Sequence, residues 1–212
     1  MKTDDLIKAL NADAAHRTMP LAAAWWLAAA LAAAVAAAVF FSTIGPRPDF
    51  NAADHTVRFL LKFVFAGSLA VAAFGCVRAL SSPGMSVRKR LPWLLVAPSM
   101  MAAAVITEMI VIPHQDWAAR LIGTNMKYCL MFIPMIGIGP LVLFIAALRY
   151  GAPTRPGLAG AMAGLLAGGL AATFYAAHCP DDSPFFVATW YTVAIAGLSV
   201  LGLLGGRLFI RW

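Results

Sequence analysis

Charged residues are scarce in this chain, and glutamate is almost absent. Only 12% of its 212 residues are charged, about half the share in an ordinary soluble domain, and Glu108 is the single glutamate. A compact soluble protein of this length needs more charge to solvate its surface. Because 62% of the residues are hydrophobic, the composition excludes a soluble globular protein and indicates a chain that lies in lipid.

The sequence also lacks the alternating hydrophobic pattern of an outer-membrane β-barrel. It contains instead six apolar runs, each long enough to cross a bilayer as a helix of about 20 residues. We therefore predict an all-α, polytopic membrane protein with a tail over residues 1–20 and a six-helix transmembrane domain over residues 21–212. The predicted spans are Leu21–Ser42, Val57–Leu80, Pro92–Ile112, Cys129–Leu148, Leu158–His178 and Val187–Gly206.

The distribution of basic residues predicts the orientation of these spans. Lys and Arg accumulate on the cytoplasmic side of membrane proteins, and an inside N-terminus puts eleven of the sixteen there. Both termini are therefore expected in the cytoplasm. The net charge of +7 then reflects contact with the lipid bilayer rather than direct binding of nucleic acid. The inside residues are Lys2, Lys8, Arg17, Arg78, Arg88, Lys89, Arg90, Arg149, Arg155, Arg207 and Arg211.

Motifs of catalysis are missing. The chain has no CxxC or HExxH sequence, which thiol oxidoreductases and zinc proteases use. Cys179 follows His178 directly, but neighbours on a chain seldom adopt the geometry of a nucleophile and its base. We expect no enzyme, no catalytic residue and no resident cofactor.

Three cysteines are present, and the predicted topology separates one from the other two. Cys76 is expected near the inner end of its span, about 30 Å from the outer edge, as an inert hydrophobic residue. Cys129 and Cys179 are expected together at the outer edge, as a structural disulfide, an oxidant- or metal-responsive switch, or two inert thiols. With His178, they are also weak candidates for transient binding of a thiophilic metal.

Gly160, Gly164 and Gly168 recur at a spacing of four in the fifth span. This spacing predicts a smooth helix face that another backbone can approach closely. The alanine-rich first span, or the glycines of the sixth span, could supply the partner surface. Those glycines are Gly197, Gly202 and Gly205.

Lys62 and Glu108 are the ionisable residues furthest inside the predicted spans. Each lies only about 6 to 8 Å from the outer end of its helix, at 1.5 Å per residue. Either the two side chains pair and hold the second span to the third, or each extends independently to the membrane surface.

The fourth span contains Pro134, Gly137, Gly139 and Pro140. Prolines remove backbone hydrogen bonds, so a break or kink is expected there. A broken helix suits the midplane site of a small transporter, which is the alternative function. No charged residue lies near the centre of a span to bind a substrate, so a kink packed against neighbouring helices is the simpler interpretation.

The tail has the pattern of a short amphipathic helix. Asp4 and Asp5 complement the dipole at its start, and Leu6, Ile7 and Leu10 form an apolar patch. Such a helix is too short to be stable alone. It either folds on a groove of a partner protein, lies on the bilayer, or continues into the first span.

Two stretches of the sequence, together with the six spans and Cys129, resemble a known family. The stretches are the start, Met1–Ile7, and the run HCPDDSP at His178–Pro184. They are similar to the NrsF family of bacterial membrane anti-sigma factors, and the resemblance covers essentially the whole chain.

The resemblance implies an inner-membrane protein that holds an extracytoplasmic-function sigma factor of the SigF type inactive through its tail and inner loops. Release would follow periplasmic heavy metal or oxidant, and the paired cysteines of the family match Cys129 and Cys179. As a mechanism, we expect chemistry at this pair to change the packing of spans four and five along the face of Gly160, Gly164 and Gly168.

Overall fold

The computed structural model describes residues 3, 19–50, 55–82 and 84–210. The tail residues with a predicted partner-binding role, Asp4, Asp5, Leu6, Ile7 and Leu10, lie outside the described residues. The helices are α2 (Leu21–Thr43), α4 (Val57–Leu80), α5 (Val96–Val111), α6 (Trp117–Ile122), α7 (Met126–Leu148), α8 (Pro156–Ala176), α9 (Pro184–Phe186) and α10 (Thr192–Phe209). Short turns extend them: η1 (Val87–Lys89) and η2 (Leu91–Leu95) before α5, η3 (His114–Asp116) before α6, and the π-helical η4 (Val187–Tyr191) before α10.

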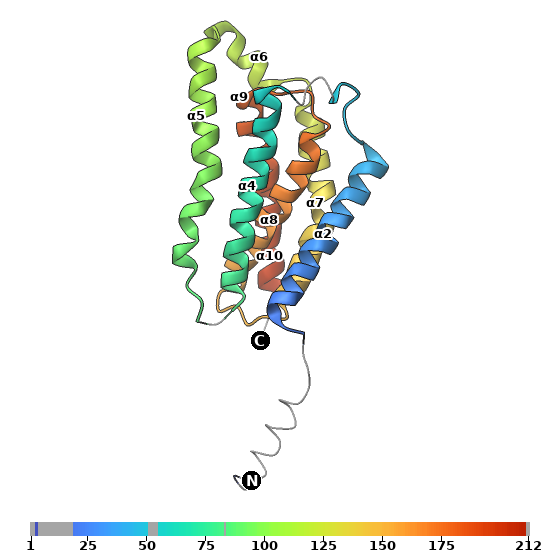
Figure 1. Cartoon of the computed structure of the whole chain (residues 1–212), viewed down its shortest axis with the longest axis vertical. Coiled ribbons are helices and arrows are strands. Elements are labelled where there is room, and N and C mark those ends of the chain that lie inside the picture. Colours follow the sequence, from blue (N-terminus) through green and yellow to red (C-terminus); the bar gives the residue numbers. More distant parts are fainter. Residues whose placement is uncertain (1–2, 4–18, 51–54, 83, 211–212) are drawn as a thin grey trace.

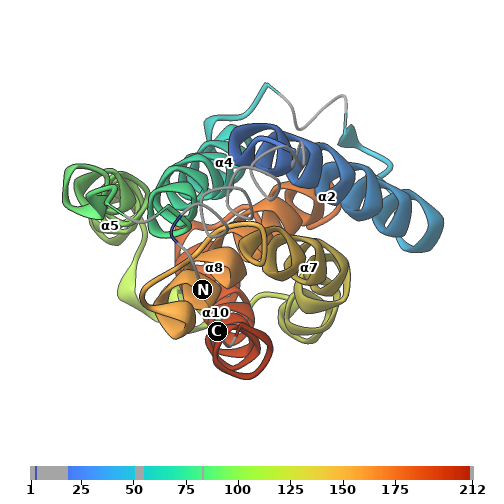
Figure 2. The same ribbon diagram turned by 90° about the horizontal axis from the view of Figure 1, so that it is seen from below.

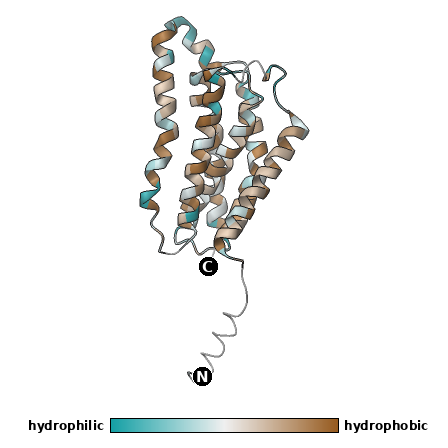
Figure 3. Ribbon diagram, viewed as in Figure 1, coloured by the Kyte–Doolittle hydropathy of each residue, from teal (hydrophilic) through white to brown (hydrophobic). Residues whose placement is uncertain are grey.

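The all-α, six-span prediction is confirmed. The described residues contain no strand, and six helical segments are long and apolar enough to cross a membrane. Helix α2 begins and α10 ends at the same end of the bundle, which we call the terminal face (Figure 1). The opposite end carries the loop with Cys179, and we call it the cysteine face. Apolar residues dominate the surface between the two faces, as a lipid environment requires (Figure 3).

Helix α8 is the centre of the bundle and packs on α10, α4 and α7 (Figure 2). Gly160 and Gly164 lie against the backbone of α10, where an added Cβ would be 2.1 Å from the Gly202 oxygen and 2.2 Å from the Leu198 oxygen. Gly168 contacts Ile195 of the same helix. The glycine face therefore packs on span six, where Gly202 is one of the predicted partner glycines and Gly197 is not in contact. The alternative partner, span one, and the expected packing of spans four and five along this face are wrong.

Helix α7 is continuous from Met126 to Leu148, although it contains Pro134 and Pro140. Of the two alternatives, a break and a packed kink, the break does not form. Backbone groups freed by proline are tolerated in a membrane helix where neighbouring helices pack tightly around it. Such packing occurs at Gly137, which is close to Leu198 and Ala171. A transporter site built on a broken fourth helix gains no support from α7.

At the terminal face, Ser81 joins three segments that are distant in the sequence. Its hydroxyl accepts a hydrogen bond from Trp25 Nε1 of α2 at 3.0 Å. Its carbonyl accepts one from the Ala152 N–H, in the loop between α7 and α8, at 3.0 Å. An added Cβ on Gly151 would be 2.3 Å from the Ser81 oxygen, so the loop approaches closely because this residue is glycine. The start of α2, directly after the tail, is thereby tied to the rest of the terminal face.

Gly160→Ala should destabilise the bundle by about 1 to 3 kcal/mol, because its new Cβ would overlap the backbone of α10. Gly197→Ala is the matched control, since nothing lies within 4 Å of a Cβ there. Thermal unfolding in detergent, followed by circular dichroism, compares the two. Equal melting temperatures would contradict close packing at Gly160.

Candidate functional site

The candidate site is the segment Ala177–Ser183, between α8 and α9, which we call the cysteine loop. Cys179 in this loop and Cys129 in the first turn of α7 are both fully buried. Both thiols are free, and they lie close enough to interact electrostatically. The Cys179 thiol donates a weak hydrogen bond to the Asp181 carbonyl at 3.8 Å. The predicted meeting of these two cysteines at one end of the bundle is therefore found, as a pair of thiols.

Lys62 of α4 binds the cysteine loop from inside the bundle. Its side chain is 0% exposed, and its ammonium donates to the Cys179 carbonyl at 2.7 Å and pairs with Asp182 Oδ1 at 2.5 Å. The same Nζ lies 5.0 Å from the centre of the Phe59 ring. The buried ammonium has three N–H donors, and these three interactions compensate for its lost hydration. The loop backbone at Cys179 is fixed by this charge.

Arg47 connects the loop to the end of α2. It forms a bidentate pair with Asp49 at 2.6 Å and donates to Asp182 Oδ2 at 3.1 Å. The Arg47 N–H also donates to the Ala177 carbonyl at 3.0 Å. These acids raise the pKa of the guanidinium, and the guanidinium lowers the pKa of Asp49.

Gly45 adds a second connection between α2 and the loop. It ends α2 in a left-handed conformation, with φ +60°, which favours glycine. Its carbonyl lies 2.9 Å from His178 Nδ1. A side chain at this position would strain the turn that directs this carbonyl toward the histidine.

Asp181 supplies the missing cap of α7. Asn125, the residue before this helix, makes no capping bond with its own side chain. The Asp181 carboxylate instead accepts the N–H groups of Thr124 at 3.0 Å and Asn125 at 2.8 Å. A carboxylate at this position satisfies backbone donors and complements the helix dipole. The cysteine loop therefore also fixes the start of the helix that carries Cys129.

Glu108 anchors the other end of the loop, and Lys62 is not its partner. Glu108 accepts hydrogen bonds from Ser183 Oγ at 2.7 Å and the Phe185 N–H at 3.3 Å. Arg58 and Arg120 approach the same carboxylate at 3.5 and 3.3 Å. The expected Lys62–Glu108 pair is wrong, and so is the alternative of two side chains that extend to the surface. Both are buried because the cysteine loop folds over them and provides other partners.

Two tyrosine hydroxyls lie beside the thiols. Tyr175 of α8 and Tyr191 of η4 are fully buried, their rings are 5.7 Å apart, and both interact with Cys129 and Cys179. Neither hydroxyl has an oxygen or nitrogen acceptor among the described residues, and the Cys179 sulfur is the group that each approaches. Tyr191 also lies on a π-helical turn, a feature that is frequent at functional sites. The site thus contains two buried donors that face the Cys179 sulfur.

The environment of Cys179 keeps its thiol protonated. Burial raises the pKa of this thiol, and the nearby Lys62 ammonium opposes that effect only in part. Since the thiolate is the reactive form, the closed loop protects Cys179 from reaction at neutral pH.

The structure assembles no metal site from the predicted candidates Cys129, Cys179 and His178. Among the described residues, no three His, Cys, Asp or Glu side chains are arranged to hold a metal ion. His178 Nδ1 is already within hydrogen-bond distance of the Gly45 carbonyl. Cys76 lies near the end of α4, at the terminal face and one turn before Leu80, so it is separated from the pair as predicted.

The comparisons with known proteins cover the whole chain. The model of the family described as NrsF, negative regulator of sigma F, matches residues 10–212. The chain belongs to the NrsF family. The anti-sigma-F factor NrsF of Caulobacter vibrioides is 38% identical and the probable anti-sigma-F factor NrsF of Azospira oryzae is 33% identical, each over 100% of both chains. No solved structure matches this NrsF-family chain.

Lys62→Met should lower the free energy of unfolding by about 1 to 3 kcal/mol, because it leaves the Cys179 carbonyl without its donor and removes one of the two cations that pair with Asp182. Arg58→Met is the control: Arg58 is half-exposed and lies 3.5 Å from Glu108, so it should cost less than about 1 kcal/mol. In a Cys76→Ala, Cys129→Ala background, a maleimide should label Cys179 faster when Lys62 is replaced. Equal labelling rates in the two variants would show that Lys62 does not hold the loop.

Proposed function

We propose that this protein binds a sigma factor of the F type at the cytoplasmic membrane and releases it when Cys129 and Cys179 react. The family match over the full chain supports the regulatory role. The observation that carries the sensing role is the cysteine loop, in which Cys179 is buried and whose residues bond segments next to α2, α4, α5 and α7. We propose no catalytic activity.

The terminal face is the cytoplasmic side in this proposal. Exposed basic residues at that face, Arg88, Lys89 and Arg149 among them, fit the excess of Lys and Arg on cytoplasmic loops. The cysteine face then lies in the periplasm of a bacterium, where oxidants and metals from outside arrive first. A sigma factor binds bacterial RNA polymerase in the cytoplasm, so its binding surface belongs at the terminal face.

The tail is the proposed contact for the sigma factor. Residues 1–20 precede α2, and Leu6, Ile7 and Leu10 provide an apolar patch for a groove on the partner. The loops near Ser81 and Gly151 lie at the same face and extend this surface. The sigma factor is sequestered because it remains at the membrane, away from promoters.

The proposed signal is oxidation or metal binding at the two thiols. With hydrogen peroxide, the thiols lose two protons and two electrons, a Cys129–Cys179 bond forms, and the peroxide becomes two molecules of water. The buried hydroxyls of Tyr175 and Tyr191, which approach the Cys179 sulfur, can donate to the sulfenate or thiolate that precedes this bond. Coordination of Cd²⁺ by both thiolates would release two protons and no electrons.

Helix α2 connects the end of the bundle that carries the cysteine loop to the tail. One end of α2 contacts the loop through Gly45 and Arg47, and the other end follows directly from residue 20. A change in the loop that releases Gly45 and Arg47 frees α2 to tilt and alters the position of the tail. About 5.5 kcal/mol shifts a population from 1:99 to 99:1.

Sequestration is tested with membranes that carry the full chain and the purified sigma factor. The intact protein should retain the sigma factor, whereas a form without residues 1–20, or with Leu6→Asp, Ile7→Asp and Leu10→Asp, should lose at least tenfold in affinity. Lys8→Gln is the matched tail control. If the truncated protein binds as well as the intact one, the tail is not the contact. If no form binds, the protein does not sequester this sigma factor.

Sensing is tested on the same membranes, loaded with the sigma factor and treated with diamide or Cd²⁺. Cys129→Ser with Cys179→Ser should bind the sigma factor normally and abolish its release, while Cys76→Ser releases it like the wild type. Arg47→Gln should lower retention without any oxidant, because it weakens the contact between α2 and the loop. Normal release from the double cysteine variant would refute the sensing role and leave the binding result intact.

A further inference from the structure

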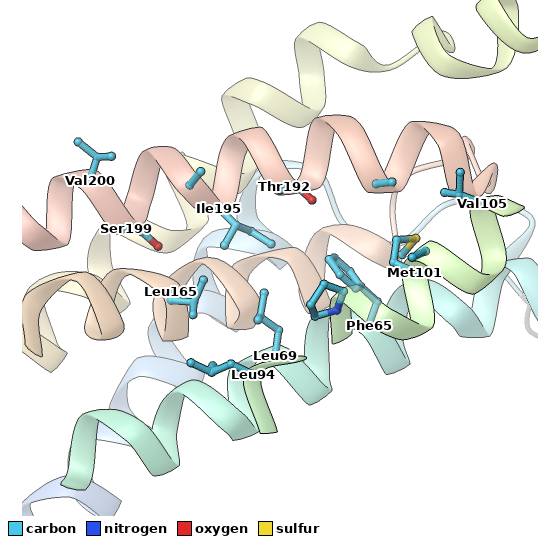
Figure 4. A pocket seen from close by; sticks show the side chains of 14 residues that line it. Phe65, Leu69, Leu94, Met101, Val105, Leu165, Thr192, Ile195, Ser199 and Val200 are labelled. Atoms are coloured by element: carbon cyan, nitrogen blue, oxygen red, sulfur yellow. The ribbon is translucent and has the colours of Figure 1, made fainter. Parts of the chain in front are cut away.

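A groove of about 700 Å³ separates α5 from the centre of the bundle. Helix α5 packs along α4 and touches α9 and η4, but it makes almost no contact with α8 or α10. The groove is therefore open on one side to the membrane. Its walls are almost entirely apolar and include Leu69, Leu94, Val105, Leu165, Ile195 and Val200 (Figure 4).

The two ends of the groove differ. Toward the cysteine face, α5 is joined to the bundle, because Glu108 near its end accepts hydrogen bonds from Ser183 and from the Phe185 N–H. Toward the terminal face, no hydrogen bond among the described residues joins η2 or the first turn of α5 to α8 or α10. A long molecule can therefore enter only from the side and from the terminal end.

Basic side chains lie at the open end. Arg88 and Lys89 are exposed and shortly precede η2, which contributes Leu94 to the groove. Arg90 and Trp93, which is 67% exposed, line a separate pocket against α4 at the same level of the bundle. Basic residues next to an exposed tryptophan are typical of the level of the lipid headgroups.

We propose that the groove binds one acyl chain of an anionic phospholipid from the leaflet at the terminal face, with the headgroup at Arg88 and Lys89. The groove extends from Leu94 to Val105, which is about 17 Å at 1.5 Å per residue. This is more than half of the hydrocarbon thickness of about 30 Å. A hydrocarbon chain of this length fits in a groove of about 700 Å³. The basic side chains at its entrance favour an anionic lipid over a second copy of a chain whose net charge is +7.

Charge makes this site selective. A lipid chain gains little by leaving other lipid chains, which are as apolar as the groove. The preference for one lipid must therefore come from the headgroup, and cations at the entrance favour a negative one. The leaflet at the terminal face is the cytoplasmic one if the proposed orientation holds, but binding to the isolated protein does not depend on orientation.

Native mass spectrometry tests the proposal on the full chain in detergent, after incubation with equal amounts of phosphatidylglycerol and phosphatidylcholine with identical chains. We expect phosphatidylglycerol to be retained preferentially. Arg88→Gln with Lys89→Gln should reduce its affinity by roughly fivefold for each residue removed. Arg149→Gln with Arg155→Gln, which removes the same charge from the loop between α7 and α8, should leave the preference unchanged.

Filling the groove provides the second test. Ala102→Phe with Ala196→Phe places two rings in it and should abolish lipid retention, whereas Ala30→Phe on the exposed surface of α2 should not. Melting curves establish whether each variant is folded. If the variant with the filled groove does not fold, the variants with altered surface charge still test the proposal. Equal retention of both lipids by the wild type, full retention by the filled variant, or protein dimers in place of lipid adducts would each overturn the proposal. None of these outcomes bears on sigma-factor binding.

Discussion

The buried ammonium of Lys62 is the constraint on which the cysteine face depends. A cation without solvent must be neutralised nearby, and the chain meets this requirement by folding the Cys179 carbonyl and Asp182 over it. The remaining acids of the loop follow from that placement. Asp181 then reaches the start of α7, and Ser183 reaches Glu108 of α5. A short polar loop thus fixes the ends of helices that otherwise pack through apolar contacts, which are weakly directional in lipid.

This arrangement makes the loop a sensible position for a sensor. The carbonyl of Cys179 accepts a hydrogen bond from Lys62. The residues on either side of Cys179 are bonded to segments at the ends of α2, α5 and α7, so a reaction at Cys179 acts on all of these contacts. The central pair, α8 and α10, is locked by direct backbone contact at Gly160 and Gly164, so it provides a rigid frame. The Gly45 end of α2 is held instead by hydrogen bonds to Ala177 and His178 of the cysteine loop. A disturbance of the loop is therefore expected to move α2 before it moves α8.

Much of the architecture was predictable, because the lengths of the apolar runs and the positions of the basic residues determine it. The six spans, the separation of Cys76 from the other cysteines and the close packing at Gly160 follow from local patterns. The partners of Lys62 and Glu108 do not follow from local patterns. The hydrophobic pattern places both residues near the membrane surface, and it does not show that a distant loop folds over them. Two signals were present nonetheless: glycine and proline directly after the first span predict a helix end at Gly45, and three polar residues in Asp181–Ser183 exceed what a simple turn requires.

The same loop also links the two proposed sites. The Glu108 carboxylate belongs to α5, which forms one wall of the proposed lipid groove, and it holds Ser183 at the end of the cysteine loop. Any reaction that moves Ser183 must also loosen α5, whose remaining contacts are mainly with α4. Coupling free energies are reciprocal, so a lipid that stabilises α5 in its present position also stabilises the closed loop. Anionic lipid would then favour the form that retains the sigma factor, and the composition of the membrane would set the threshold for its release.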